Sequence, residues 1–267
     1  ELFRRSKNSI VQAHFGMSAR VWELIAKPAF NDAALARNWG FTSASELAVL
    51  DQVPKMLERT QLTYEELERL ISSQLFLRFN LMIHRGAKLC DVADDRLMHG
   101  PVANSVPTPL DVSRRSQVLD LIHRFVRLRR VLGWPIERLS EVLSQRALFL
   151  FDKETQEHDK ETEESDLVEL YRLIRLAARL RLSVEDVARL NPSRLARAIG
   201  RHDKELAYLI DLSGTKPFDG PPERPFDLAG VETLLDESNA IDTAGLDLAE
   251  LRYLLGHWDL VPAVFEP

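Results

Sequence analysis

The sequence contains one cysteine, Cys90, in 267 residues, so no disulfide can form within it. Glycine is also scarce, with 11 residues, while leucine, arginine and glutamate, which favour helices, are abundant. No apolar run approaches the roughly 20 residues that a membrane-spanning helix needs. The sequence begins Glu1-Leu2-Phe3 and shows no signal peptide. We therefore expect a piece of a longer chain that folds without covalent cross-links.

The excess of negative charge is confined to a single segment. The formal net charge is −6, and residues 152–166 alone hold eight acidic and two basic side chains. The remainder is balanced, so charge gives no indication of a nucleic-acid or membrane partner. We expect residues 152–166 to form a solvated loop.

Apolar residues recur at helical spacing along the chain. Between Arg114 and Leu132 they lie three and four residues apart, and Gly133 follows as a stop signal. Residues 167–180 repeat this pattern, and we also expect helices over residues 51–59 and 195–212. Irregular stretches are expected at residues 100–112, 152–166 and 213–226, the first and last of which are rich in proline. No segment alternates long enough to predict a strand.

One short phrase recurs at predicted helix starts. It reads Leu62-Thr63-Tyr64-Glu65-Glu66-Leu67, Trp134-Pro135-Ile136-Glu137-Arg138-Leu139, Leu182-Ser183-Val184-Glu185-Asp186-Val187 and, more loosely, Leu246-Asp247-Leu248-Ala249-Glu250-Leu251. Thr63 and Ser183 are expected to cap helices, with Glu66 and Asp186 completing capping boxes. Pro135 suits a first helical turn. The predicted structural turn and capping residues are Leu62, Thr63, Glu66, Gly133, Trp134, Pro135, Leu182, Ser183 and Asp186.

The repeat predicts the fold class. Each phrase follows a longer predicted helix, which gives a unit of long helix, turn and short helix. The phrases are spaced 72, 48 and 64 residues apart, whereas a solenoid keeps a fixed period. We therefore expect residues 1–267 to form a single all-α segment, an irregular bundle of helical hairpins.

The sequence offers no recognisable chemistry. It lacks a His-x-x-x-His or Cys-x-x-Cys pair, a phosphate-binding glycine loop and a nucleophile elbow. The nearest cluster of metal-ligand types is His84, Cys90, Asp91, Asp94, Asp95 and His99, which is more typical of caps and solvated turns. We predict no catalytic, cofactor-binding or metal-binding residue, no cofactor, and a protein that is not an enzyme.

A second interpretation comes from arginine. The phrase at residues 182–187 precedes a predicted helix bearing Arg194, Arg197 and Arg201, an arrangement similar to a DNA-binding helix-turn-helix. The same arginines are also explained by ion pairs with neighbouring helices, or by stems that cover apolar surface, and the balanced charge outside residues 152–166 favours this explanation. A helix-turn-helix nucleic-acid-binding protein is kept as the alternative function.

Two longer segments carry a family resemblance. Residues 53–67 (VPKMLERTQLTYEEL) and 121–139 (LIHRFVRLRRVLGWPIERL), with the pair Cys90-Asp91 between them, resemble the shell region of the A subunit of bacterial insecticidal toxin complexes (Tc toxins). The resemblance covers about residues 45–260. Arg129 and Ser140 depart from the pattern, at positions where such segments carry an aromatic residue and an aspartate.

The resemblance implies a role without catalysis. Such an A subunit is a homopentamer whose α-helical shell surrounds a translocation channel that delivers a toxin into host cells. Its partners would be other A-subunit protomers, the B–C toxin components and, through other parts of the chain, a host-cell receptor or glycan. The protein would fold in the bacterial cytoplasm and then be secreted. Neither nucleic acid nor a transmembrane segment in this piece is expected.

Overall fold

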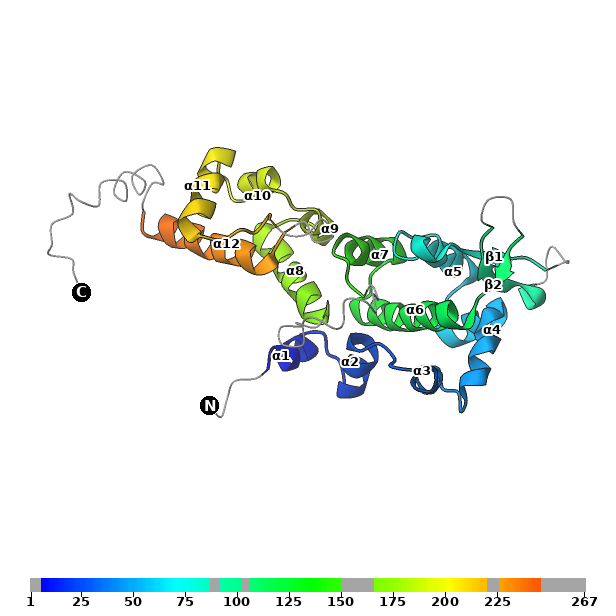
Figure 1. Ribbon diagram of the computed structural model, residues 1–267. Coiled ribbons are helices and arrows are strands. Elements are labelled where there is room, and N and C mark those ends of the chain that lie inside the picture. The colour runs from blue at the N-terminus through cyan, green and yellow to red at the C-terminus, as the bar shows by residue number, and fades with distance from the viewer. Residues whose placement is uncertain (1–5, 87–91, 102–105, 150–165, 220–225, 246–267) are drawn as a thin grey trace, which may run out of the picture. The chain divides into compact units, whose positions relative to one another are not determined.

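The computed structural model describes residues 6–86, 92–101, 106–149, 166–219 and 226–245. These residues are mostly helical and include one small sheet (Figure 1). The chain divides into two compact units, residues 1–171 (unit 1) and 172–267 (unit 2). The boundary falls inside helix α8, Asp166–Leu180.

Unit 1 begins with a series of short helices. These are α1 (Lys7–His14), α2 (Ala19–Ala26), α3 (Asp32–Trp39), α4 (Val53–Thr60) and α5 (Tyr64–Ile71), with 3₁₀ turns at Ala44–Asp51, Leu77–Phe79 and Val92–Asp94. The long helix α6 (Val112–Leu132) and helix α7 (Ile136–Gln145) follow, as expected from the pattern that ends at Gly133. Gly133 takes the left-handed conformation, with φ 66°, that ends helices without a steric penalty.

Helix α6 is the centre of unit 1. Its residues 118–126 are buried on all sides, which is typical of a helix enclosed by others rather than lying at a surface. Helices α2 and α3 contact it, while α5 packs against α7 (Figure 1). Phe125 of α6 meets Phe76 edge to face, with ring centroids 6.2 Å apart. The apolar residues of α2, α3 and the Phe76 turn therefore pack around one helix.

The prediction of a mostly helical chain is confirmed, but the sheet was not expected from the sequence, and the prediction that no segment forms a strand is wrong. Strands β1 (Leu81–His84), β2 (Arg96–His99) and β3 (Thr108–Pro109) pair in that order, antiparallel. The two longer strands have four residues each and no run of β-branched side chains. They are therefore too short to be recognised as strands from an alternating apolar and polar pattern. β3 lies within residues 100–112, which were predicted to be irregular.

Buried ion pairs hold α7 and the start of α8 to the core. The Nη2 of Arg146 lies 2.8 Å from Oε1 of Glu169, and the Arg146 side chain is 2% exposed. Arg124 of α6 donates from Nε to the Ile25 carbonyl oxygen at 2.8 Å and lies over the Phe149 ring at 4.4 Å. Asp120 and Asp166 each lie 3.8 Å from its guanidinium. These cations are buried with partners, as burial of charge requires.

Unit 2 contains the second part of α8 and four further helices among its described residues. They are α9 (Val184–Ala188), α10 (Pro192–Ala198), α11 (Asp203–Ser213) and α12 (Leu228–Thr243). Helix α12 is joined to α8 by an ion pair of 2.7 Å between Arg179 and Asp236, and it also contacts α11. The predicted phrase at residues 246–251 lies outside the described residues.

The single helix predicted over residues 195–212 is wrong, because α10 and α11 are separate. Gly200 takes a left-handed conformation, with φ 70°, that an α-helix cannot contain. His202 then starts α11, and its backbone N–H donates to Glu205 Oε2 at 2.8 Å. Of the predicted loops, residues 152–165 lie outside the described residues, whereas Asp166 begins α8. Residues 214–219 are non-helical, and Asp227 caps α12.

Replacing Glu169 by Ala is expected to destabilise the protein by about 3 kcal/mol, because it removes the Glu169 carboxylate from the buried Arg146 guanidinium. The matched control is Glu137→Ala, since Glu137 pairs with Arg69 at 3.2 Å where both side chains are about half exposed. That control should cost less than about 1 kcal/mol. Urea unfolding followed by circular dichroism measures both changes, and equal losses would contradict the assignment of the buried pair.

Candidate functional site

The predicted capping residues start their helices with different geometry. At α5, the N–H of Glu66 donates to Thr63 Oγ1 at 3.1 Å, and the N–H of Thr63 donates to Glu66 Oε2 at 2.9 Å, which makes a reciprocal capping box. At α9, the N–H of Asp186 donates to Ser183 Oγ at 3.0 Å, but the Ser183 hydroxyl donates to Asp186 Oδ2 at 2.7 Å. The aspartate is one methylene shorter than glutamate and takes the hydroxyl in place of the backbone N–H.

The other predicted turn residues lie at packed junctions. Leu62 is buried ahead of α5, and Leu182 is half-buried ahead of α9. Pro135 is the N-cap residue of α7. The Arg138 guanidinium covers the half-buried Trp134 ring at 4.4 Å. These residues join helices and bring no reactive groups together.

The cluster of metal-ligand types is occupied by structural contacts. Asp95 accepts a hydrogen bond from the Tyr64 hydroxyl at 3.1 Å and another from the Gly86 N–H at 2.8 Å. Nδ1 of His99 lies 3.1 Å from the Phe79 carbonyl oxygen. Within the described ranges no three His, Cys, Asp or Glu side chains gather to hold a metal ion. Cys90 and Asp91 lie outside these ranges.

Two of the three arginines on which the helix-turn-helix interpretation depends lie beside carboxylates. The turn between α9 and α10 ends at Asn191, whose side chain accepts from the Arg194 N–H. The Arg194 side chain lies 3.9 Å from Asp186, and Arg201 forms an ion pair with Asp242. α10 has seven residues and exposes Arg197.

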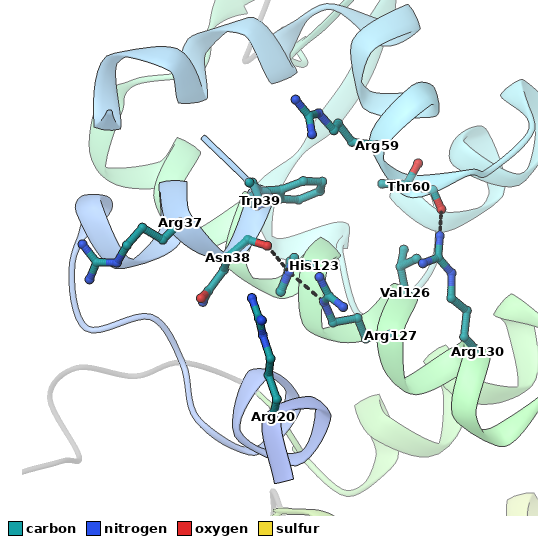
Figure 2. Close-up of a pocket in the computed structure, with 11 residues that line it drawn as sticks. Arg20, Arg37, Asn38, Trp39, Arg59, Thr60, His123, Val126, Arg127 and Arg130 are labelled. Atoms are coloured by element: carbon teal, nitrogen blue, oxygen red, sulfur yellow. Dashed lines mark hydrogen bonds between the residues drawn. The ribbon is translucent and has the colours of Figure 1, made fainter. Parts of the chain in front are cut away.

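An arginine-lined pocket in unit 1 is the most distinctive site, and the sequence did not predict it. Its volume is about 350 Å³, and α2, α3, α4 and α6 all contribute to it (Figure 2). Five arginines line it, together with Asn38, Trp39, Gly40, Thr60, His123 and Val126. The arginines are Arg20, Arg37, Arg59, Arg127 and Arg130. Among the described residues that line the pocket, none is acidic.

Side chains of α6 reach the ends of the helices around the pocket. Nη2 of Arg130 donates to the Thr60 carbonyl oxygen, at the end of α4, at 2.5 Å. Nε2 of His123 lies 3.0 Å from the carbonyl oxygen of Asn38, in the last turn of α3. Figure 2 shows both contacts, with Arg127 directed at His123. Carbonyls in a last helical turn have no partner within the helix, so these contacts satisfy them.

The His123 ring is neutral and only partly satisfied. Burial, together with the charges of Arg127, Arg124 and Arg130, lowers its pKa from 6.5 to about 4. Nε2 also lies 2.8 Å from Nε of Arg127. It cannot both donate to the Asn38 carbonyl and accept from the guanidinium, because a neutral ring nitrogen does one or the other. Nδ1 is buried and has no partner in the described structure.

Positive charges repel one another around the ring. Burial lowers the pKa of Arg127, and Arg130 and Arg20 lower it further. Trp39 lies beside His123, with ring centroids 5.3 Å apart, and its buried Nε1 has no hydrogen-bond partner among the described residues. The pocket therefore combines clustered cations with buried polar atoms that lack partners.

Sequence reasoning missed the pocket because its arginines come from four separate helices. Arg127 and Arg130 lie in the helix predicted between Arg114 and Leu132, where they form no motif by themselves. Arg20, Arg37 and Arg59 gave no signal of their own. Only the packing of α2, α3 and α4 against α6 brings the five together.

No family model, curated protein or solved structure matches the chain in comparisons of sequence and of fold. Over the residues that the structure describes, no helix combines the length and the apolar character needed to cross a membrane.

The neutral His123 predicts a pH dependence of stability. Its folded pKa of about 4 lies below the unfolded value of 6.5, so the unfolded state binds more protons between these values. The stabilisation is complete above pH 6.5 and is lost as the pH falls towards 4, by roughly 3 kcal/mol. Unfolding free energies measured across this range should show a smaller acid loss for His123→Gln than for the wild type. The exposed His84→Gln is the control, and an unchanged slope in both variants would contradict the assignment.

Proposed function

We propose that this chain is a non-catalytic structural and interaction segment of a Tc-toxin-like A subunit. It would form part of the helical shell around a translocation channel that delivers a toxin into host cells. The proposal rests first on the two phrases that carry the resemblance, residues 53–67 and 121–139.

The observation that carries the proposal is that these two phrases pack against each other. Oε1 of Glu66, in the first phrase, lies 2.6 Å from Nη2 of Arg129, in the second. Arg69, just after the first phrase, pairs with Glu137 of the second at 3.2 Å. Segments about 70 residues apart in sequence thus form one structural unit, which supports reading their shared order as one inherited motif.

The two positions that depart from the family pattern have local partners. Arg129 pairs with Glu66, and Oγ of Ser140 accepts from the Leu75 N–H at 3.4 Å in the core. Both departures therefore join the same helices, α5, α6 and α7 and the turn that follows α5. These contacts support the interpretation that the chain is a variant of the same helical unit rather than an unrelated arrangement of helices.

The finer architecture belongs to the proposal too. The pairs α4–α5, α6–α7 and α8–α9 each join two helices through a tight turn. We take them as hairpins of an irregular bundle, with the small sheet as an insertion. In the assembled toxin this segment would contact neighbouring A-subunit protomers, while the B–C components and a host receptor or glycan would engage other parts of the chain. Secretion would follow folding in the bacterial cytoplasm.

The proposal predicts a homopentamer. The complete gene product that contains this sequence, purified and viewed by negative-stain electron microscopy, should form five-fold symmetric bell-shaped particles. A complete product that is strictly monomeric in sedimentation and microscopy would overturn the proposal.

The alternative, a helix-turn-helix nucleic-acid-binding protein, predicts salt-dependent retention on DNA. Retention at low salt that weakens when Arg194 and Arg197 are both changed to Ala would favour it over the shell segment. We expect no such retention, because Arg194 lies 3.9 Å from Asp186 and Arg201 is paired with Asp242. Gel-shift measurements at about 50 mM salt, where phosphate contacts bind most tightly, check this.

A further inference from the structure

The arginine-lined pocket has a charge that its own protein groups do not balance. None of its five arginines forms an ion pair with a carboxylate among the described residues. Lys55 and, less strongly, Arg59 lower the pKa of Glu58, but this exposed carboxylate pairs with Lys55, at 2.9 Å. The cations around the pocket therefore lack the neutralising partners that Arg129, Arg146 and Arg179 have elsewhere in the molecule.

Helix ends do not remove this excess. The C-terminal ends of α3 and α4 line the pocket, and each helix end carries at most about half a negative charge. Two such ends offset roughly one of five positive charges, whereas α2 brings Arg20 from its N-terminal turn. About four positive charges therefore remain unbalanced around the pocket.

The floor of the pocket also has polar atoms without partners. Trp39 is 6% exposed and His123 is 5% exposed, yet Trp39 Nε1 and His123 Nδ1 have no hydrogen-bond partner in the described structure. Buried polar atoms are almost always hydrogen-bonded, and each exception costs free energy. A ligand that accepts hydrogen bonds would satisfy the indole N–H and give Arg127 a partner other than the imidazole.

We propose that this pocket binds a small polyphosphate-type anion, with Arg20, Arg127 and Arg130 pairing with its oxygens and Trp39 donating from its indole. The inference goes beyond the shell function and does not depend on it. Guanidinium groups suit phosphate oxygens because their planar donors pair with two oxygens at once. The volume of about 350 Å³ lies at the small end of ligand pockets, so a diphosphate or triphosphate group fits better than a large organic ligand.

Figure 2 places the groups for such a ligand. Arg20 extends from α2 towards Asn38 and His123, and Arg127 approaches the same imidazole from α6. Arg59, which also lies over the Phe41 ring at 4.8 Å, stands on the far side of Trp39. An anion between Arg20 and Arg127 would separate two guanidinium groups whose mutual repulsion lowers the pKa of Arg127.

Isothermal titration of the full chain with pyrophosphate, tripolyphosphate and ATP at constant ionic strength tests the proposal. Binding of the inorganic anions is expected, and a matching affinity for ATP would show that the phosphates are the recognised part. Tighter binding of ATP would indicate that the pocket recognises the same phosphate group as part of a nucleotide. Competition by adenosine alone, or no binding of any of the three anions, would overturn the proposal.

A matched pair of variants locates the site. The double variant Arg20→Gln, Arg127→Gln should weaken binding by about tenfold or more, the loss expected for charge-assisted hydrogen bonds. The control Arg69→Gln, Arg114→Gln removes the same charge from exposed positions outside the pocket. It should change the affinity by less than about threefold, since distant exposed charges are screened. Equal losses in both would mean nonspecific charge attraction and would contradict a pocket site.

Trp39→Phe separates ligand recognition from folding. Removing the unpartnered indole N–H should weaken anion binding several-fold, while thermal unfolding without anion shows no loss beyond that of the smaller ring. A variant that unfolds earlier by a large margin yet binds the anion as the wild type does would exclude the indole as a donor to the ligand.

Discussion

The arrangement of unit 1 depends on one constraint: polar side chains of α6 must satisfy the backbone groups where other helices end. Arg124 reaches the Ile25 carbonyl oxygen near the end of α2, His123 contacts that of Asn38 near the end of α3, and Arg130 that of Thr60 at the end of α4. Asp120 accepts from the Ala29 N–H just after α2. Each contact is buried or half-buried, so none can be exchanged for water without opening the packing. Together they fix where three helices stop on one face of a fourth.

The same constraint explains the pocket. Helix ends that converge on α6 bring their last-turn arginines, Arg37 and Arg59, to the place where α6 presents Arg127 and Arg130. Basic residues suit the negative end of each helix, but their sum exceeds what the helix ends can balance. The excess positive charge thus follows from the way in which α6 holds the helix ends. A bound anion would reduce the electrostatic repulsion between the arginines.

The long helices α6 and α8 could be predicted from sequence, because an apolar stripe between Arg114 and Leu132, followed by Gly133, is a strong signal. Helix α12 was not predicted. The Thr63 capping box could also be predicted, because it is local in sequence. Sequence reasoning missed strands of four residues, which are too short for alternation to register. It also missed the break at Gly200, where a local backbone conformation overrides continuous helical periodicity. The pocket was out of reach because its residues meet only through tertiary packing.

Native-state hydrogen exchange in Arg124→Met tests most directly the claim that α6 holds the helix ends. Met keeps the apolar length of the side chain but cannot donate to the Ile25 carbonyl. The account predicts that backbone amides of α2, whose end Arg124 holds, lose protection, while those of α5 and α7 keep it, since α5 and α7 pack against each other. A uniform loss across all these helices, or no loss in α2, would contradict it.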